Sequence, residues 1–153
     1  MKMIIEVNSE RGMKQIGAKL GVLLRGGEII ELIGDVGAGK TTLTKGIGEG
    51  LGVTEDVQSP SFTISRVYEG RDALRLAHYD FYRLHDAGIM AHDLEEAIGD
   101  PETVTVIEWA DIAQGVLPIE RLTIHITSPT EAKRELQIEA QGERYQQLSR
   151  ELA

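Results

Sequence analysis

The chain has 153 residues, of which 41% are hydrophobic, and this is enough for one core of ordinary size, so we expect a single domain over residues 1–153. The formal net charge of −9 argues against direct, charge-driven binding of nucleic acid or of an anionic membrane, because both depend on Lys and Arg side chains that neutralise phosphates. Cysteine is absent, which excludes disulfides and thiolate metal sites, and no apolar run approaches the length of a signal peptide or a transmembrane helix. We therefore expect a cytoplasmic protein with no membrane partner, whose contact with any RNA passes through another protein.

The first part of the chain predicts a βαβ unit. Residues 3–7 form a short apolar run typical of a strand, and Ser9 is a suitable N-cap for the helix that follows. Apolar residues recur with a mostly helical period from residue 13 to residue 24, and Gly26-Gly27 ends this pattern. A second apolar strand is expected over residues 28–33.

The run Gly34-Asp35-Val36-Gly37-Ala38-Gly39-Lys40-Thr41 fits the nucleotide-binding pattern G-x-x-x-x-G-K-S/T at every fixed position. It lies between the second strand and a helix expected at residues 40–51, which is the context that this P-loop motif requires. Its glycines let the backbone approach an anion, and the N–H groups and the positive end of the helix converge on phosphates. We predict that Lys40 reaches the β- and γ-phosphates and that the Thr41 hydroxyl binds Mg²⁺.

Gly46, Gly48 and Gly50 lie inside the helix expected after the P-loop. Each costs about 1 kcal/mol relative to alanine in a helix, so this helix must depend on tertiary packing or on a bound nucleotide. We interpret these glycines as small residues for close helix packing rather than as groups with a chemical role.

The stretch after this helix predicts a loop and an antiparallel hairpin. Residues 57–63 are polar and contain a proline, which is typical of an ordinary turn. In phosphate-switching proteins, a hydroxyl-bearing loop at this place can also sense the γ-phosphate or complete the Mg²⁺ shell. Residues 62–69 and 73–80 alternate in part around a turn, which predicts a hairpin that a purely parallel sheet would not contain.

Two acidic residues follow expected strands and are candidates for phosphate chemistry. Asp80 ends the second strand of the hairpin, where a Walker-B carboxylate would lie, although a simple helix cap is the competing interpretation. Glu108 directly follows a buried strand at residues 103–107, and open α/β sheets bind ligands at the carboxyl ends of their strands. The two carboxylates compete for the roles of metal ligand and water-orienting group. Trp109, the only tryptophan, either packs in the core or shapes this site.

The rest of the chain completes the predicted sheet. His78 and His85 lack companions at metal-ligand spacing, and we interpret them as surface or strand-packing residues. Further elements are expected from their patterns: helices at residues 92–99, 110–116 and 143–152, and an antiparallel pair of strands at 121–127 and 135–140. Together these elements predict an α/β protein, a P-loop NTPase-like three-layer sandwich whose mixed sheet includes antiparallel strands.

These motifs, in this order, resemble the bacterial TsaE (YjeE) family of small P-loop ATPases. The residues that carry the likeness are the P-loop run with Thr42, Ser59-Pro60-Ser61-Phe62-Thr63, His78-Tyr79-Asp80-Phe81-Tyr82-Arg83-Leu84 and Ile107-Glu108-Trp109. Their order and spacing cover nearly the whole chain. A vast superfamily shares the P-loop, whereas the D-x-Y-R-L run with the later E-W pair is more particular. Ser61 stands where the family usually has threonine, so a hydroxyl is kept.

The resemblance implies an ATPase required for the N6-threonylcarbamoyladenosine (t6A) modification of tRNA next to the anticodon. The protein would act with a TsaD-like transferase and a TsaB-like companion, and ATP hydrolysis would reset that complex between catalytic cycles. The partners would hold the tRNA, in agreement with the acidic character of this chain.

The same resemblance implies ATP and Mg²⁺ as cofactors and assigns roles to single residues. Lys40 and the P-loop amides would bind the phosphates, Thr41 and Glu108 would bind Mg²⁺, and Asp80 would support the metal or the attacking water. The other residues that it places at the nucleotide are Thr42 in the P-loop helix, Ser61 and Thr63 in the switch-like loop, Trp109 beside the site, and Ser9, Met13 and Arg134 as candidates for the base pocket.

Three other classes of protein use the same loop. A small-molecule kinase needs an acceptor pocket and usually an arginine-rich lid, and it is disfavoured because the sequence shows no arginine-dense lid; Arg71 and Arg75 on the expected hairpin are the nearest to one. A GTP-driven switch is disfavoured because the guanine-reading N-K-x-D signature cannot follow the P-loop, the only asparagine being Asn8. A nucleotide-binding regulatory subunit with little turnover stays open, since a partner can complete a catalytic arrangement.

Overall fold

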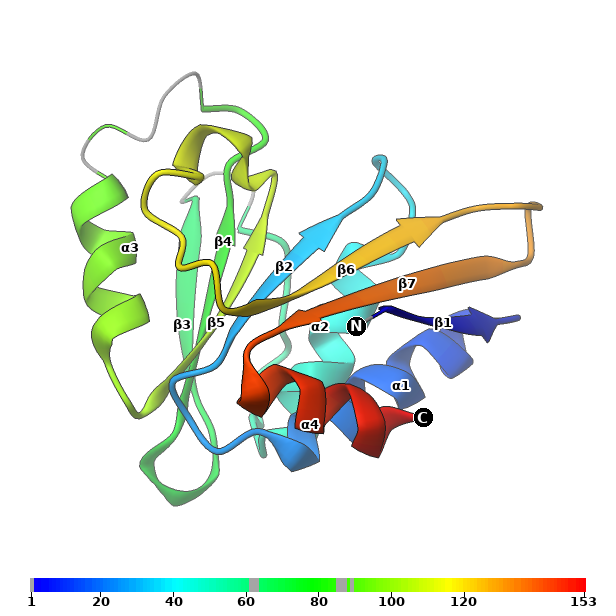
Figure 1. Cartoon of the computed structure of the whole chain (residues 1–153), viewed down its shortest axis with the longest axis horizontal. Helices are drawn as coiled ribbons and strands as arrows, with labels where there is room; N and C mark the ends of the chain where they lie inside the picture. The colour runs from blue at the N-terminus through cyan, green and yellow to red at the C-terminus, as the bar shows by residue number, and fades with distance from the viewer. Residues whose placement is uncertain (1, 61–63, 85–87, 89) are drawn as a thin grey trace.

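The computed structural model describes residues 2–60, 64–84, 88 and 90–153, which form a mixed sheet of seven strands with helices on both faces (Figure 1). The strand order is β1-β7-β6-β2-β5-β4-β3. The strands are β1 Lys2–Val7, β2 Ile29–Ile33, β3 Ser65–Glu69, β4 Arg75–Asp80, β5 Thr103–Glu108, β6 Arg121–Thr127 and β7 Arg134–Gln141. The α-helices are α1 Glu10–Leu23, α2 Lys40–Gly50, α3 Met90–Gly99 and α4 Glu143–Leu152, with 3₁₀ turns at Arg71–Ala73 and Ala110–Ala113.

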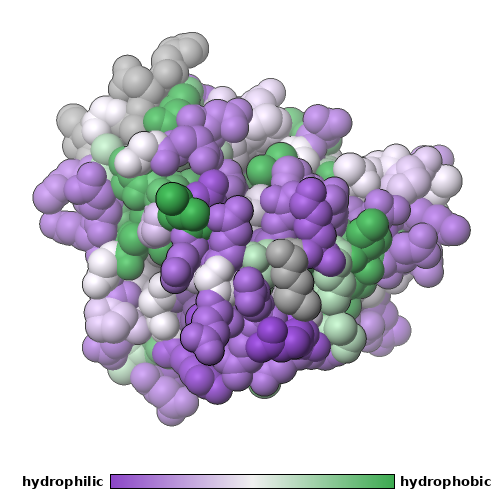
Figure 2. All heavy atoms as spheres, in the orientation of Figure 1, coloured by the Kyte–Doolittle hydropathy of each residue, from purple (hydrophilic) through white to green (hydrophobic). Residues whose placement is uncertain are grey.

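The predicted three-layer α/β architecture is confirmed. Helices α1, α2 and α4 cover one face of the sheet, and α3 with the segment after β5 covers the other face where β4 and β5 lie (Figure 1). Strands β6 and β7 turn half-buried polar side chains such as Thr123 and Glu139 to this second face, away from the main core. Figure 2 shows hydrophilic residues over most of the visible surface, with hydrophobic ones in small groups. No helix in the described ranges is long and apolar enough to cross a membrane.

The first strand lies at an edge of the sheet rather than beside the P-loop strand. β1 pairs antiparallel with β7, β7 pairs antiparallel with β6, and β6 runs parallel to β2. β1 and β2 are therefore parallel, as a βαβ unit requires, but the predicted C-terminal pair of strands is inserted between them. Local patterns do not encode this insertion, because it joins segments more than 100 residues apart. The predicted hairpin, β3 with β4, is confirmed as antiparallel.

Glycines bring the backbones of α1 and α2 into direct contact. A Cβ atom added to Gly17 would lie 2.4 Å from a carbonyl oxygen of α2. In the same way, a Cβ atom on Gly46 or on Gly50 would lie 2.2 Å from a carbonyl oxygen of α1. No real Cβ atom approaches an oxygen so closely, so any larger residue would push the helices apart. The interpretation of Gly46 and Gly50 as packing residues is confirmed, whereas Gly48 faces the side chain of Val57.

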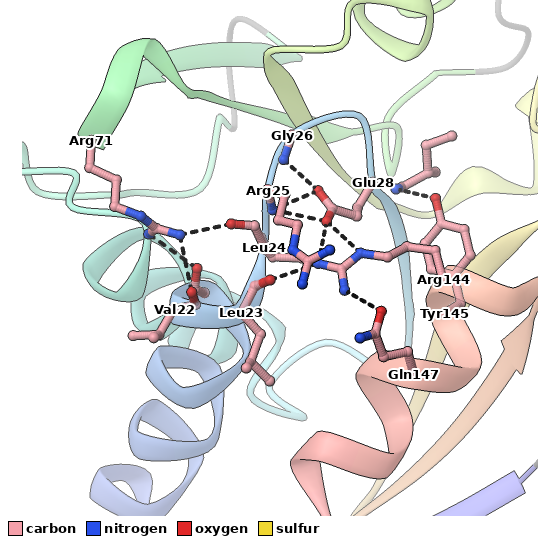
Figure 3. Close-up of polar contacts among 12 residues, drawn as sticks. Val22, Leu23, Leu24, Arg25, Gly26, Glu28, Arg71, Arg144, Tyr145 and Gln147 are labelled. Atoms are coloured by element: carbon pink, nitrogen blue, oxygen red, sulfur yellow. Dashed lines mark hydrogen bonds and ion pairs between the residues drawn. The ribbon is translucent and has the colours of Figure 1, made fainter.

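A buried carboxylate, Glu28, ties the end of α1 to the start of the P-loop strand (Figure 3). It accepts hydrogen bonds from the backbone N–H groups of Arg25 at 2.9 Å and Gly26 at 2.7 Å. Arg144 of α4 donates to it at 2.8 Å and also donates to a carbonyl oxygen of α1. A buried charge is tolerated only when it is paired and hydrogen-bonded, as it is here. This network sets where β2 begins, and therefore where its carboxyl end meets the P-loop.

Arg71 and Arg75, the candidates for a kinase lid, lie at the opposite end of the sheet from the P-loop. The Arg71 guanidinium donates to backbone carbonyl oxygens at the C-terminal ends of α1 and α2, including that of Leu24 at 2.7 Å (Figure 3). A cation is stabilised there by the negative end of each helix dipole. Arg75 begins β4 and pairs with Asp100 at 2.6 Å. Both arginines therefore make structural contacts and do not form a lid over the P-loop.

We predict that Gly46→Ala destabilises the protein, because the new methyl group would meet backbone atoms of α1 that cannot move without separating the helices. The expected loss is about 2 kcal/mol of unfolding free energy or more, as for an overpacked core, although alanine favours a helix by about 1 kcal/mol. Gly99→Ala is the matched control, since a Cβ atom there has nothing within 4 Å. Urea unfolding followed by circular dichroism measures both variants. Equal stability of Gly46→Ala and the wild type would refute the backbone contact.

Candidate functional site

The P-loop forms the predicted connection between the carboxyl end of β2 and the N-terminus of α2. Gly37 and Gly39 have φ angles of 83° and 110°, in the left-handed region where residues with a side chain are strained. A turn inside the loop is closed by a hydrogen bond from Ala38 N to Asp35 O of 3.0 Å. This backbone leaves N–H groups and the positive end of α2 free to face an anion, which is the geometry of a phosphate cradle.

Lys40, the first residue of α2, is held at the base of this cradle. Its Nζ donates to Gly34 O at 2.5 Å and lies 4.0 Å from the centroid of the Trp109 ring. Burial lowers the pKa of Lys40 from its usual value, while nearby carboxylates, first among them that of Glu108, raise it. The lysine is therefore already positioned as a point charge beside the loop.

A cavity of about 250 Å³ opens in front of the loop and, besides the predicted loop residues Val36, Gly37 and Gly39, brings together five further residues predicted from the sequence. These are Lys40, Thr41, Asp80, Glu108 and Trp109. Three further polar or aromatic residues that were not assigned to the site also line it, namely Ser59, Tyr82 and Arg83. The sequence contained a clue to these three residues, because all of them lie in the segments that carry the family likeness.

The two candidate carboxylates come from neighbouring parallel strands. Asp80 of β4 and Glu108 of β5 are directly opposite in the register of the sheet. Asp80 accepts hydrogen bonds from Ser59 Oγ at 3.3 Å and from Tyr82 N at 3.0 Å. It therefore stabilises the turn after β4, in place of the helix cap that was considered, and still lines the cavity. Glu108 is 3% exposed and contacts the cavity from inside the sheet.

His78 is fully buried on β4, so of the two interpretations, surface residue or strand-packing residue, the second is confirmed. It lies two residues before Asp80 on the same strand, and its Nε2 is 2.5 Å from Oε2 of Glu108. Alternation along β4 puts His78 and Asp80 on the face that α2 covers. The pairing of β4 with β5 then brings the imidazole to Glu108.

Trp109 adopts a left-handed backbone conformation with φ of 56° directly after β5. This conformation turns its ring over Lys40 and against Tyr82, with the two ring centroids 4.8 Å apart. Both roles considered for Trp109 agree with this placement, because its ring lines the cavity and also packs against the core cluster on the α3 side of the sheet. A non-glycine residue at positive φ stores strain, and such residues cluster at functional sites.

A second cavity, of about 350 Å³, lies on the other side of the same loop. Ser9, Met13 and Arg134, which the family likeness suggested for a base pocket, all line it together with Thr42. Arg134 Nε donates to Ala38 O at 3.1 Å, so this side chain also supports the loop. The two cavities share Gly37 and Gly39, and they therefore form adjoining spaces around one loop. Ser9 is in addition the N-cap of α1, as predicted.

Comparison with known proteins decides the family. The family described as "Threonylcarbamoyl adenosine biosynthesis protein TsaE" matches residues 7–136. This chain belongs to the TsaE family. A protein of Bacillus subtilis named "tRNA threonylcarbamoyladenosine biosynthesis protein TsaE" is 40% identical over 148 residues, covering 96% of this chain and 90% of that relative. A Streptomyces coelicolor protein of the same name is 42% identical over 115 residues, covering 74% of this chain and 78% of that relative.

A solved structure extends the TsaE assignment to three dimensions. It is entitled "Crystal structure of Bacillus subtilus YdiB" and superposes with a TM-score of 0.83 at 35% identity. The match covers 99% of this chain and 94% of that chain. The whole described fold is therefore similar to that protein, and not the P-loop region alone.

Some residues predicted for the TsaE site cannot be placed in these cavities. Ser61 and Thr63, like His85, lie outside the described residues. Val36 is exposed and lines the first cavity, whereas Asp35, also exposed, lines with Gly34 a separate small cavity rather than either of the two cavities around the loop. Its contribution to phosphate binding would therefore come from its backbone.

The oxygen-bearing side chains at this site suit Mg²⁺ when a nucleotide supplies further ligands. Across the residues that the structure describes, no group of three His, Cys, Asp or Glu side chains could hold a metal ion. The Thr41 hydroxyl and the carboxylates of Asp80 and Glu108 all line the first cavity. Mg²⁺ is commonly bound by one or two carboxylates together with phosphate oxygens and water, and these side chains match that requirement.

Proposed function

We propose that this protein binds and hydrolyses ATP, with Mg²⁺, in the t6A modification of tRNA next to the anticodon. The observation that supports this best is the convergence of a P-loop lysine, the following threonine and two carboxylates in one cavity. The named t6A biosynthesis relatives, which align over most of the chain, supply the biological process. In this proposal the protein acts with a TsaD-like transferase and a TsaB-like companion in the cytoplasm.

The nucleotide would occupy both cavities around the P-loop. The phosphates would lie in the first cavity, where Lys40 and the N–H groups of the loop supply positive charge. The adenosine would lie in the second cavity, against Met13 and Arg134. The two cavities meet where Met13 of α1 lies close to Gly39 of the loop. A Cβ atom added to Gly39 would be 3.1 Å from Met13 Cε, so a nucleotide that occupies both cavities would have to pass along the glycine backbone.

The reaction that suits this site is attack of water on the γ-phosphorus. A bond forms between the water oxygen and the phosphorus while the bond to the β-phosphate oxygen breaks, giving ADP and phosphate. Thr41 and Glu108 would hold Mg²⁺, and the bound ion would offset the charge of the β- and γ-phosphate oxygens. Lys40 stabilises the same oxygens, and Asp80 orients the water or supports the metal.

A partner is expected to complete this site. Val36 on the loop and Tyr82 at the cavity wall are large residues with 72% and 56% of their surface exposed. Exposed apolar and aromatic residues beside a catalytic cavity are typical of an interface, and we expect weak hydrolysis by the protein alone. The net charge of −9 supports tRNA binding through the partner proteins rather than by this chain.

We predict that Lys40→Ala lowers the affinity for ATP by about 100-fold or more, because hydrogen bonds to charged groups are worth about 1.5–3 kcal/mol each. Lys45→Ala is the matched control, since Lys45 lies one turn along α2 and pairs with Asp56 at the surface. Isothermal titration calorimetry measures both variants. Affinity close to that of the wild type for Lys40→Ala would contradict the phosphate assignment.

Arg134→Ala should separate the base pocket from the phosphate cradle. We expect the affinity for ATP to fall by about 10-fold, as for a lost charge-assisted hydrogen bond, while the affinity for inorganic tripolyphosphate stays the same. Lys133→Ala, a change at the exposed neighbouring residue, is the control. An equal loss for both ligands would mean that Arg134 acts only by supporting Ala38 of the loop.

The test of the whole proposal is t6A formation over several turnovers with the TsaD-like and TsaB-like partners and tRNA. We expect later turnovers to require the wild-type protein and to fail with Glu108→Gln, which should bind ATP but not hydrolyse it at a useful rate. Turnovers that continue in the absence of the protein would overturn the proposed role in t6A formation. ATP binding and the fold would be unaffected by that outcome.

A further inference from the structure

The contact between His78 and Glu108 is a buried pair directly behind the nucleotide cavity. The side chain of His78 is 0% exposed and that of Glu108 is 4% exposed, so no bulk water reaches the 2.5 Å contact between Nε2 and Oε2. The pair lies on the face of the sheet that α2 covers, because His78 shares a face of β4 with Leu76, and Glu108 a face of β5 with Val106, both in the core under α2. Glu108 also lines the cavity, whereas His78 does not. The imidazole can therefore affect a nucleotide only through the carboxylate.

The surroundings of the other ring nitrogen of His78 indicate which atom donates the hydrogen bond between His78 and Glu108. Nδ1 is buried and has no hydrogen-bond partner within the described part of the chain. An imidazolium would leave an N–H donor buried without an acceptor, which is costly, whereas a neutral ring leaves only a lone pair there. This arrangement of partners favours a hydrogen bond donated by Nε2–H of His78 to Oε2 of Glu108. The tautomer follows from the arrangement of partners around the ring.

We propose that His78 is a positioning residue that holds one carboxylate oxygen of Glu108 and leaves the other oxygen for the nucleotide cavity. The inference rests on the proposed function, in which Glu108 binds Mg²⁺ or orients the attacking water. An arginine or lysine at position 78 would also fix the carboxylate, but it would neutralise the charge that the metal needs. A neutral ring of fixed geometry orients Glu108 without that cost.

Two substitutions distinguish positioning from simple space filling. His78→Gln places its amide nitrogen near the position of Nε2, so it can still donate to Glu108. His78→Asn keeps a polar amide, but at the position of Nδ1, too far from Glu108. Since partners of metal ligands typically contribute 10- to 100-fold in metal affinity, we expect His78→Asn to weaken Mg²⁺-dependent binding of a non-hydrolysable ATP analogue by about that factor, and His78→Gln to restore most of it.

Calorimetry over a series of Mg²⁺ concentrations provides the measurement, and thermal unfolding checks that both variants are folded. Without Mg²⁺, both variants should bind the analogue like the wild type, because Glu108 then has no metal to hold. In a Glu108→Gln background, His78→Asn should have no further effect on the Mg²⁺ dependence, since the two residues act as one unit. Equal losses in His78→Asn and His78→Gln, or no loss in either, would overturn the proposal.

A further test uses the wild-type protein, so it does not depend on the folding of any variant. Long-range ¹H–¹⁵N NMR spectra of the histidine rings should show His78 as the neutral tautomer protonated at Nε2. A proton on Nδ1, or a charged ring, would contradict the assignment. The proposed function fails separately: a wild type that binds nucleotide with no dependence on Mg²⁺ would remove the role of Glu108 itself, whatever the tautomer of His78.

Discussion

The close contact between α1 and α2 is the constraint on which the nucleotide site depends. Glycines on both helices let the two backbones touch, as at Gly17 and Gly46, and this brings the N-terminal turn of α1 beside the P-loop. As a result Met13 packs against Gly39, and the second cavity acquires a wall that the P-loop motif alone does not provide. The helix that carries Lys40 accepts unfavourable glycines because they determine how close its neighbour lies.

Three buried glutamates in and beside the central strands show how the same residue type serves different ends. Glu28 and Glu31 each pair with an arginine at 2.8–3.0 Å, and these pairs hold α4 and β6 to the P-loop strand. Glu108 pairs with His78 instead. The arginine pairs neutralise charge in the body of the protein, where it would be costly. At the carboxyl end of β5 a negative charge is retained beside Lys40, where a bound cation and a phosphate chain can use it.

Predictions from the sequence were most accurate where structure is local. The P-loop, the β3–β4 hairpin and the C-terminal pair of strands depend on turn residues and alternation over a few positions, and each is present in the expected place. For His78 the sequence left two interpretations open, surface or strand packing, because the same alternating pattern suits a solvent-facing strand and a buried one. The pairing of β4 with β5 turned it into a partner of Glu108. The position of β1 at the edge of the sheet could not be predicted from local patterns either, since it depends on pairing with β7.

The sequence by itself determined the phosphate loop, the candidate carboxylates Asp80 and Glu108, and the fold class, because these follow from motif, spacing and periodicity along the chain. Only the tertiary structure decided which residues meet: that Trp109 lies over Lys40, that Arg134 reaches Ala38, and that a buried imidazole holds Glu108. Such contacts depend on strand order, register and helix separation. Those are set by packing between distant segments, which no local pattern contains.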